Sequence, residues 1–168
     1  MSFIDQSRRI SRFVVVLSSI WCTLIVVAPL LRFLGVSVSS VFYLLFSEVC
    51  HQIPERSFHI AGEPLAVCVR CSAIYFSFLA SLLVAPFFVR FHFTHYPPAW
   101  VLIAAVAPTA LDVLLNLAGL HGSTVWTRAL TGVTAGLVIP FFLMPPLIEA
   151  IHQLAGKFGG LSHAGKTQ

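Results

Sequence analysis

Residues 50–58 read Cys-His-Gln-Ile-Pro-Glu-Arg-Ser-Phe, and residues 68–71 read Cys-Val-Arg-Cys. Together they bound a polar loop, residues 50–71, that holds three of the four cysteines and two of the seven histidines. Pro54, Gly62 and Pro64 oppose a long helix in this loop. The sequence on both sides is apolar. We therefore expect the chemistry of the protein to be concentrated in this loop, and the fold to consist of helices on either side of it.

The composition around the loop is that of a membrane protein. The chain has 168 residues, of which 58% are hydrophobic and 10% charged, and its mean hydropathy is +0.92. Soluble domains carry about 25% charged residues. The net charge of +4 is small and spread along the chain, which argues against nucleic acid as a partner. It fits basic residues that flank membrane spans, so the predicted partner is the lipid bilayer.

The apolar runs predict an all-α integral membrane protein with about four transmembrane helices, because such a helix needs about 20 apolar residues. The expected spans are residues 13–31, 72–89, 99–120 and 128–151. They form one helical membrane domain, residues 13–152, between a polar N-terminal segment, residues 1–12, and a loose C-terminal tail, residues 153–168.

A further apolar run, residues 36–49, precedes the loop and is too short to cross a bilayer. We interpret it as an interfacial or re-entrant helix that delivers Cys50 to the membrane surface. The alternative is that it joins Phe33 and Leu34 in a second full crossing, which would reverse the later topology.

The distribution of basic residues predicts the orientation. Four spans place both termini on one side of the membrane. The basic residues on that side would be Arg8, Arg9, Arg12, Arg90, Lys157 and Lys166. Those on the other side would be Arg32, Arg56, Arg70 and Arg128. Cytoplasmic segments carry the excess of Lys and Arg. We thus expect a multi-pass protein of the cell (inner) membrane with cytoplasmic termini and the loop on the non-cytoplasmic side.

The loop contains the elements of a metal site. Cys68 and Cys71 form a CxxC pair at the start of an expected helix, and Cys50 with His51 supplies two further ligands. Cys3His is a common ligand set of structural zinc sites. The hypothesis is a site for zinc or another transition metal, with His59 as a substitute if adjacent residues 50 and 51 do not both bind.

The same thiols allow two other interpretations. A CxxC pair at a helix N-terminus is also a redox dithiol, because the helix end and Arg70 stabilise a thiolate. The protein would then be a membrane thiol–disulfide oxidoreductase that works with a quinone. Alternatively, Cys50 forms a disulfide with Cys68 or Cys71 that only staples the loop. Cys22, in the middle of the first span, is expected to be a buried structural residue.

Polar residues inside the expected spans are candidates for function. Asp112 lies within the third span, with Asn116 one turn further on the same face, and Arg128 opens the fourth span. A carboxylate in hydrocarbon is costly and is usually paired or faces a polar cavity. We hypothesise that Asp112 and Arg128 pair or together line a cavity beneath the loop. They are the candidate catalytic residues if the protein is an enzyme.

Gly132 and Gly136 share a face with Arg128 at four-residue spacing. Small residues at this spacing allow another helix to approach closely. This face could pack within the chain, or it could form a homo-oligomer or a larger membrane complex in which the protein is a non-enzymatic subunit.

These residues resemble a family signature. Cys-His-Gln at 50–52, Pro-Glu-Arg-Ser-Phe at 54–58 and Cys-x-Arg-Cys at 68–71 are similar to the domain-of-unknown-function family 2085 of prokaryotic membrane proteins. Asp112, Gly119, Arg128, Thr131, Gly132 and Gly136 resemble the second half of that family. Ala73 and Ser77 stand where the family pattern has glycines. The resemblance implies a small multi-span membrane protein with an important Cys/His loop, and it implies no assigned activity or substrate.

Overall fold

The computed structural model describes residues 3–88, 97–120 and 122–164, and helices dominate this part of the chain. The helices are α1 (Phe3–Phe33), α2 (Ser39–Ser47), α3 (Val69–Phe88), α4 (Ala99–Leu117) and α5 (Val125–Ala164). Between α2 and α3 lie the 3-10 helix η1 (Pro54–Arg56) and the antiparallel strands β1 (His59–Ile60) and β2 (Glu63–Pro64). The prediction of an all-α membrane protein is confirmed, with this small hairpin as an addition.

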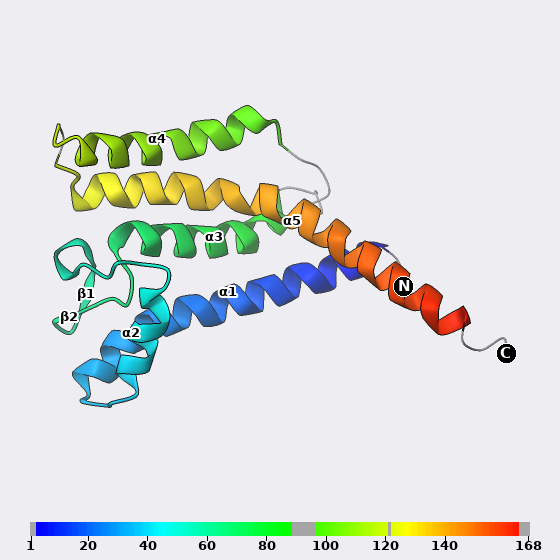
Figure 1. Cartoon of the computed structure of the whole chain (residues 1–168), viewed down its shortest axis with the longest axis horizontal. Coiled ribbons are helices and arrows are strands. Elements are labelled where there is room, and N and C mark those ends of the chain that lie inside the picture. The colour runs from blue at the N-terminus through cyan, green and yellow to red at the C-terminus, as the bar shows by residue number, and fades with distance from the viewer. Residues whose placement is uncertain (1–2, 89–96, 121, 165–168) are drawn as a thin grey trace.

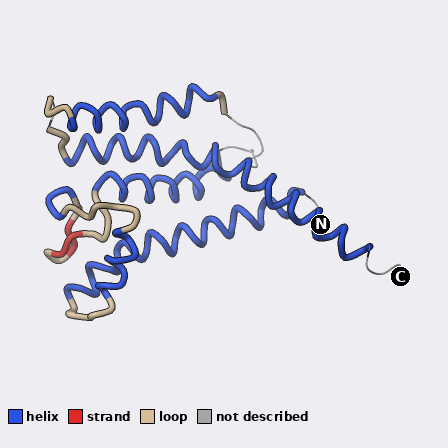
Figure 2. The backbone as a smooth tube through the Cα atoms, viewed as in Figure 1, coloured by secondary structure: helices blue, strands red, loops and turns tan. Residues whose placement is uncertain are grey.

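The long helices lie side by side in the order α4, α5, α3 and α1 (Figure 1), and the contact between α3 and α5 is the most extensive. The short helix α2 folds back against α1. The strand pair and most of the loop gather at one end of the helices, whereas α1 begins and α5 ends at the opposite end (Figure 2). The first end is called the loop end below, and the second is called the far end.

Two helices end at glycines, as their sequence requires. Gly35 after α1 and Gly119 after α4 have φ values of 71° and 69°, a conformation that glycine adopts without steric cost. After α1, the Gly35 and Val36 N–H groups donate to the carbonyls of Arg32 and Leu31. After α4, Gly119 and Leu120 repeat this pattern. Both are Schellman motifs, which satisfy the last helical carbonyls and turn the chain.

The number of spans differs from the prediction. Among the described residues, the helical stretches long and apolar enough to cross a membrane are Asp5–Phe33, Ala99–Leu117 and Val125–Ala155. The expected span at residues 72–89 is α3, whose described apolar part, Val69–Ala85, is shorter. The count by length and composition is thus three rather than four. Because α3 lies between α1 and α5 and buries serines there, it needs less apolar surface than a lipid-exposed helix.

Two other segments refine the expected boundaries. The apolar run at residues 36–49 contains α2, which has 9 residues and is far too short for a second crossing. At the other end of the chain, α5 continues to Ala164, beyond the expected end of the span near residue 151. This helix contains Pro140, Pro145 and Pro146, and it changes direction along its length (Figure 1). Prolines inside a helix are a common cause of such bends.

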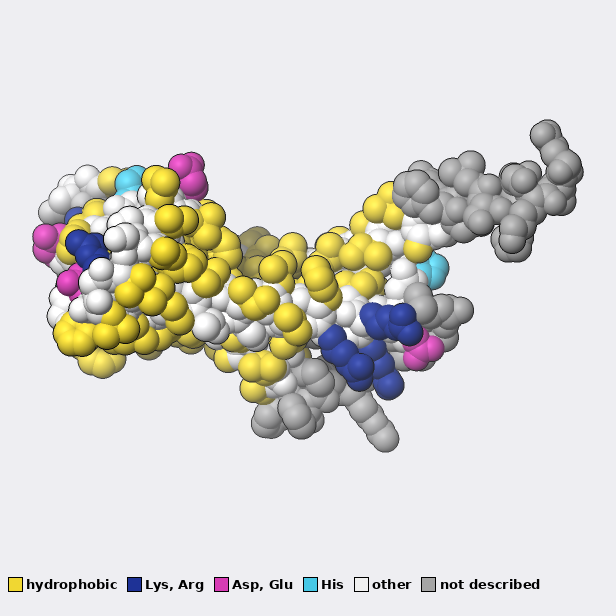
Figure 3. Space-filling view, turned by 90° about the horizontal axis from the view of Figure 1, so that it is seen from below, with side chains coloured by type: hydrophobic (Ala, Val, Ile, Leu, Met, Phe, Trp, Pro, Cys, Tyr) yellow, Lys and Arg dark blue, Asp and Glu magenta, His cyan; other side chains and the backbone are white. Residues whose placement is uncertain are grey.

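The outer surface of the helices is apolar. Large exposed hydrophobic side chains include Phe13 and Leu17 on α1, Ile103 and Leu114 on α4, and Leu130 on α5. Figure 3 shows hydrophobic side chains over the middle of the molecule and charged groups towards its ends. An apolar belt between charged ends is the surface that a bilayer requires.

The buried hydrophobic residues form one cluster at each end. The loop-end core consists of Ile25, Ala28, Phe46, Cys50, Leu65, Ala66 and Val67. The far-end core consists of Ile10, Leu82, Ala85, Met144 and Ile148. Cys22 is 4% exposed, in agreement with its expected structural role. The loop residues 65–67 belong to the first core, so burial fixes the loop against α1 and α2.

Candidate metal centre

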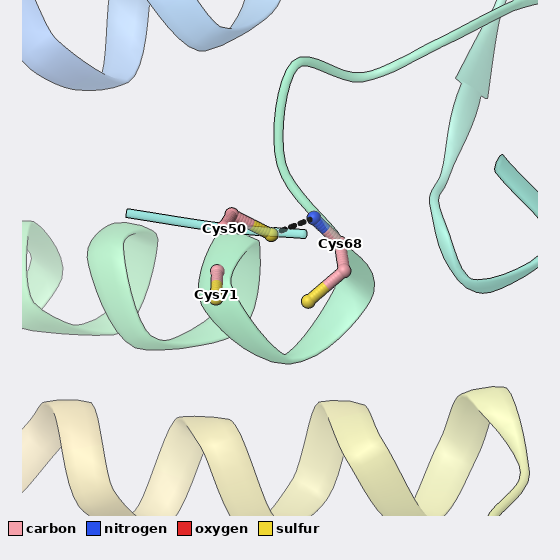
Figure 4. Close-up of side chains that lie close together, drawn as sticks. All are labelled: Cys50, Cys68 and Cys71. Carbon is pink, nitrogen blue, oxygen red and sulfur yellow. Dashed lines mark hydrogen bonds between the residues drawn. The ribbon is translucent and has the colours of Figure 1, made fainter. Parts of the chain in front are cut away.

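Three cysteines meet at the loop end of the molecule. Cys50 follows α2, Cys68 immediately precedes α3, and Cys71 lies in the first turn of α3. Their Sγ atoms all lie within 4.8 Å of one another. Figure 4 shows the three side chains converging from the loop and from α3. The structure thus brings together three of the four residues that the sequence proposes as ligands.

Gln52 holds the two halves of the loop together. Its Nε2 atom donates to the carbonyl of Tyr43, at 2.6 Å, and to that of Ala66, at 2.8 Å. The first carbonyl belongs to α2 and the second to the segment that leads to Cys68. Gln52 itself has a φ of 50°. This role of Gln52 could not be predicted from the sequence, because an amide that bridges two backbone carbonyls leaves no recognisable spacing in the sequence.

The hairpin is attached to the helices by a second set of contacts. The Tyr43 hydroxyl donates to the carbonyl of Pro64 at 2.5 Å. Arg32 Nε lies 3.0 Å from a Glu63 carboxylate oxygen, and the Arg32 guanidinium carbon lies 5.1 Å from the centre of the Tyr43 ring. Both side chains of the ion pair are partly exposed, so it contributes about 1 kcal/mol at most.

The thiols interact with one another and with the backbone. The Cys68 N–H group donates to Cys50 Sγ at 3.2 Å. Hydrogen bonds from the Cys50 and Cys71 thiols to the Cys68 sulfur lower the pKa of Cys68 to about 2. All four cysteines are free, so the disulfide staple considered above is not formed in this structure. Cys68 therefore favours its thiolate form, which is the form that binds metals and attacks disulfides.

The three-cysteine cluster has dimensions that fit a zinc ion. A tetrahedral ion with Zn–S distances of about 2.3 Å separates its sulfur ligands by about 3.8 Å. The observed upper limit of 4.8 Å requires the sulfurs to approach by about 1 Å at most. His51 and His59 are exposed. Among the described residues, no histidine or carboxylate joins the three sulfurs within that limit.

A polar cluster lies close to the cysteines and links α3, α4 and α5. The Arg70 guanidinium forms an ion pair with Asp112, and the Ser123 hydroxyl donates to the same carboxylate oxygen at 2.8 Å. Arg128 Nε donates to the Ser123 carbonyl at 3.3 Å. The expected Asp112–Arg128 pair is thus corrected to an Asp112–Arg70 pair. Arg70 lies in the first turn of α3, and its side chain reaches Asp112 on α4, a contact that chain order alone does not reveal.

The glycine face of α5 packs within the chain. A Cβ atom at Gly132 would lie 2.7 Å from the Arg70 carbonyl oxygen and 2.8 Å from Ala73 Cβ. One at Gly136 would overlap Ser77 Oγ and the Ile74 carbonyl. This face is therefore covered by α3 within the chain. Because Gly132 and Gly136 have no side chain, α5 can pack close to α3 although α3 carries Ala73 and Ser77 where the family pattern has glycines.

Comparison with known proteins agrees with this arrangement. A family model described as a predicted membrane protein, DUF2085, matches residues 50–142. The chain belongs to the DUF2085 family. The DUF2085 match begins at Cys50 and includes the three-cysteine cluster, the Arg70–Asp112 pair and the glycine face. The resemblance inferred from the sequence signature is thereby confirmed.

The relatives of this DUF2085 protein are archaeal and uncharacterised. A protein of Methanocaldococcus jannaschii is 36% identical over 135 residues, which cover 77% of this chain and 86% of the relative. A protein of Methanothermobacter thermautotrophicus is 36% identical over 94 residues, which cover 55% of this chain and 81% of the relative. No solved structure matches the chain.

Proposed function

We propose that this membrane protein binds one transition-metal ion, with zinc as the first candidate, through the thiolates of Cys50, Cys68 and Cys71. The observation that carries the proposal is the convergence of three sulfur atoms within 4.8 Å. Thiolates are soft ligands that favour zinc, copper(I) and iron–sulfur clusters over magnesium or calcium. The lowered pKa of Cys68 supports the proposal, because a metal replaces the proton of each thiol that it binds.

The fourth coordination position decides between a structural and a catalytic ion. His51 is the fourth ligand expected from the sequence, and its exposed side chain would have to turn inwards to bind. We assign this position to water or to a bound ligand, since three protein ligands and one open position characterise catalytic zinc sites. A metal ion there would polarise its ligand and lower the pKa of a bound water. Asp112 and Arg128, which belong to the polar cluster at the loop end, are the candidate residues to assist a reaction at the metal ion.

The test is metal content measured by mass spectrometry on detergent-purified protein kept anaerobic. We expect about one zinc ion per chain, lost in Cys68→Ser and Cys71→Ser and kept in His51→Ala. Cys22→Ser is the matched control, because Cys22 lies outside the cluster and its thiol points to the Tyr75 carbonyl at 3.6 Å. Metal-free wild-type protein with all thiols intact would refute the proposal.

A second candidate function is thiol–disulfide exchange, and the lowered pKa of Cys68 favours it. The Cys68 and Cys71 thiols would form a disulfide and release two electrons and two protons, which reduce a quinone to a quinol. The Cys50 thiolate would attack this disulfide and form a Cys50 disulfide with one of the pair. A substrate dithiol would then reduce that bond through a mixed disulfide, so that the substrate leaves as a disulfide and all three thiols are restored. Thiol counting separates the two functions: metal-free protein that lacks two free thiols until a reductant is added supports exchange.

We also propose the orientation expected from the sequence, with cytoplasmic termini and the loop on the opposite face. It is supported by the fact that α1 begins and α5 ends at the same, far end of the helices (Figure 2), although the described apolar part of α3 is short for a span. Arg8, Arg9 and Arg12 lie on the first part of α1, at the far end. Arg90 and Lys166 lie outside the described residues, as does the side chain of Lys157. Fusions of the C-terminus to a fluorescent protein and to alkaline phosphatase test the orientation. Phosphatase activity without fluorescence would reverse it.

A further inference from the structure

Arg128 is a buried cation with unused hydrogen-bond donors. Its residue is 9% exposed, and its Nε atom donates to the Ser123 carbonyl at 3.3 Å. In the described part of the chain, neither terminal nitrogen of this guanidinium has a hydrogen-bond partner. A guanidinium offers five N–H donors, so four remain available. The terminal nitrogens are not among the buried side-chain atoms that lack a partner, so they keep contact with solvent and are accessible to a ligand.

The nearest carboxylate does not neutralise Arg128. Asp112 already binds the Arg70 guanidinium and accepts a hydrogen bond from Ser123. No ion pair within 4.0 Å joins Arg128 to any described carboxylate. The carboxylate that the sequence suggested as its partner is therefore committed to a different cation.

Two like charges act on Arg128. Arg56, on η1, and Arg70, on α3, repel its guanidinium, whereas Asp112 and Cys68 attract it. Burial also disfavours the charged guanidinium, and an added anion would stabilise a cation placed in this way.

We infer that Arg128 and Arg56 form a binding site for a phosphate-type oxyanion beside the three-cysteine cluster. Arg128 would bind two oxygens through its terminal nitrogens, the bidentate geometry in which guanidinium groups recognise phosphate. Arg56 is exposed on the loop and would contact the anion from the solvent side. The site uses no cysteine and needs no metal ion, so it is independent of the proposed metal centre.

Two kinds of molecule could present a phosphate group to Arg128 and Arg56 at the loop end. One is a soluble phosphate group, and the other is the head group of an anionic phospholipid, because the loop end adjoins the apolar belt of the helices. Binding of inorganic phosphate to detergent-purified protein, followed by calorimetry, tests the first source. Retention of phosphatidylglycerol by protein in nanodiscs that also contain phosphatidylcholine, followed by mass spectrometry, tests the second.

The decisive variants are Arg128→Lys and Arg56→Gln, with Arg9→Gln as the control. Lysine keeps the charge of Arg128 and loses the forked donors, and we expect at least about tenfold weaker binding of the preferred source. Arg56→Gln changes an exposed side chain, so it should leave folding intact and weaken binding several-fold. Arg9 is exposed on α1 at the far end, and its replacement should leave binding unchanged.

The outcomes separate this inference from the metal proposal, because zinc content is measured on the same samples. Weakened anion binding with unchanged zinc supports an independent anion site. If wild type binds neither source, or if Arg56→Gln and Arg128→Lys both bind as tightly as wild type, the anion site is overturned whatever the zinc content. Loss of zinc without loss of anion binding would concern only the three-cysteine metal site and would leave the anion site supported.

Discussion

The two ends of the helix bundle are held together by different chemistry. At the far end, the core is built from Ile10, Leu82, Ala85, Met144 and Ile148, all of them apolar. At the loop end, apolar residues share the interior with Cys50, and a buried Asp112 and Arg128 lie close by. The same helices α1, α3 and α5 pass through both ends.

This difference indicates which end of the molecule carries residues for a function beyond folding. In the described part of the far end, these helices pack without any buried charged side chain. Burying ionised groups costs several kcal/mol per ion before their attraction is counted. The loop end therefore contains charges and thiols that packing does not need, and a function is the simplest reason for them.

Asp112→Asn should break the ion pair with Arg70 and leave a largely buried guanidinium without its counter-charge. Loss of one partner of a buried pair costs about 3–5 kcal/mol. We expect a marked fall in the thermal unfolding midpoint of the protein in detergent. Glu149→Gln, at an exposed residue of α5, is the control and should change the midpoint little. Equal midpoints for both variants would show that the pair does not stabilise the fold.

Met144→Ala should destabilise the far end and spare the loop end. Met144 is fully buried, and truncation of such a side chain costs about 2–5 kcal/mol. The unfolding midpoint should fall, whereas the zinc content at a temperature well below the midpoint should stay that of the wild type. Leu143→Ala is the matched control, because the neighbouring side chain is 48% exposed on the outer surface. Loss of zinc in Met144→Ala would contradict the separation of the two ends.

Gly136→Ala tests the close contact between α5 and α3. The new methyl group would overlap Ser77 Oγ and the Ile74 carbonyl, and overpacking of this kind costs about 1–3 kcal/mol. The free energy of unfolding in denaturant measures the loss. Gly122→Ala is the control, since a Cβ atom there meets nothing within 4 Å. If both variants were equally stable, the two helices would be further apart than described.

Gln52→Ala should have the smallest effect on stability and a clear effect on the metal centre. It removes two hydrogen bonds to backbone carbonyls, which are together worth about 1–2 kcal/mol. Because these bonds set the separation of Cys50 and Cys68, we expect weaker zinc binding in competition with a chelator. Gln153→Ala, at an exposed residue of α5, should leave zinc affinity unchanged. Equal affinities would show that the loop is held without Gln52.

The sequence alone predicted the helical architecture well. Hydropathy located α1, α4 and α5, because lipid-facing helices must be apolar over their whole length. It overstated α3 as a span, since this helix is covered by its neighbours and buries Ser72, Ser77 and Ser81. The shortness of the apolar run before Cys50 correctly predicted α2.

The sequence predicted which residues form the candidate site, but it did not predict all of their contacts. The CxxC pair and Cys50 were identified, because thiols are rare and their spacing is recognisable. The partners of Asp112 and Gln52 were missed, because an ion pair between α3 and α4 and an amide bound to two carbonyls depend on how the helices pack. The glycine face showed only that a helix approaches closely, and the structure identified that helix as α3.

The start of α3 belongs to several parts of the molecule at once. Cys68 and Cys71 belong to the three-cysteine cluster, Arg70 pairs with Asp112 of α4, and the Arg70 carbonyl lies against Gly132 of α5. A ligand that shifted the start of α3 would therefore act on α4 and α5 without touching either helix, and by reciprocity a shift of these helices would change the affinity of the loop for that ligand.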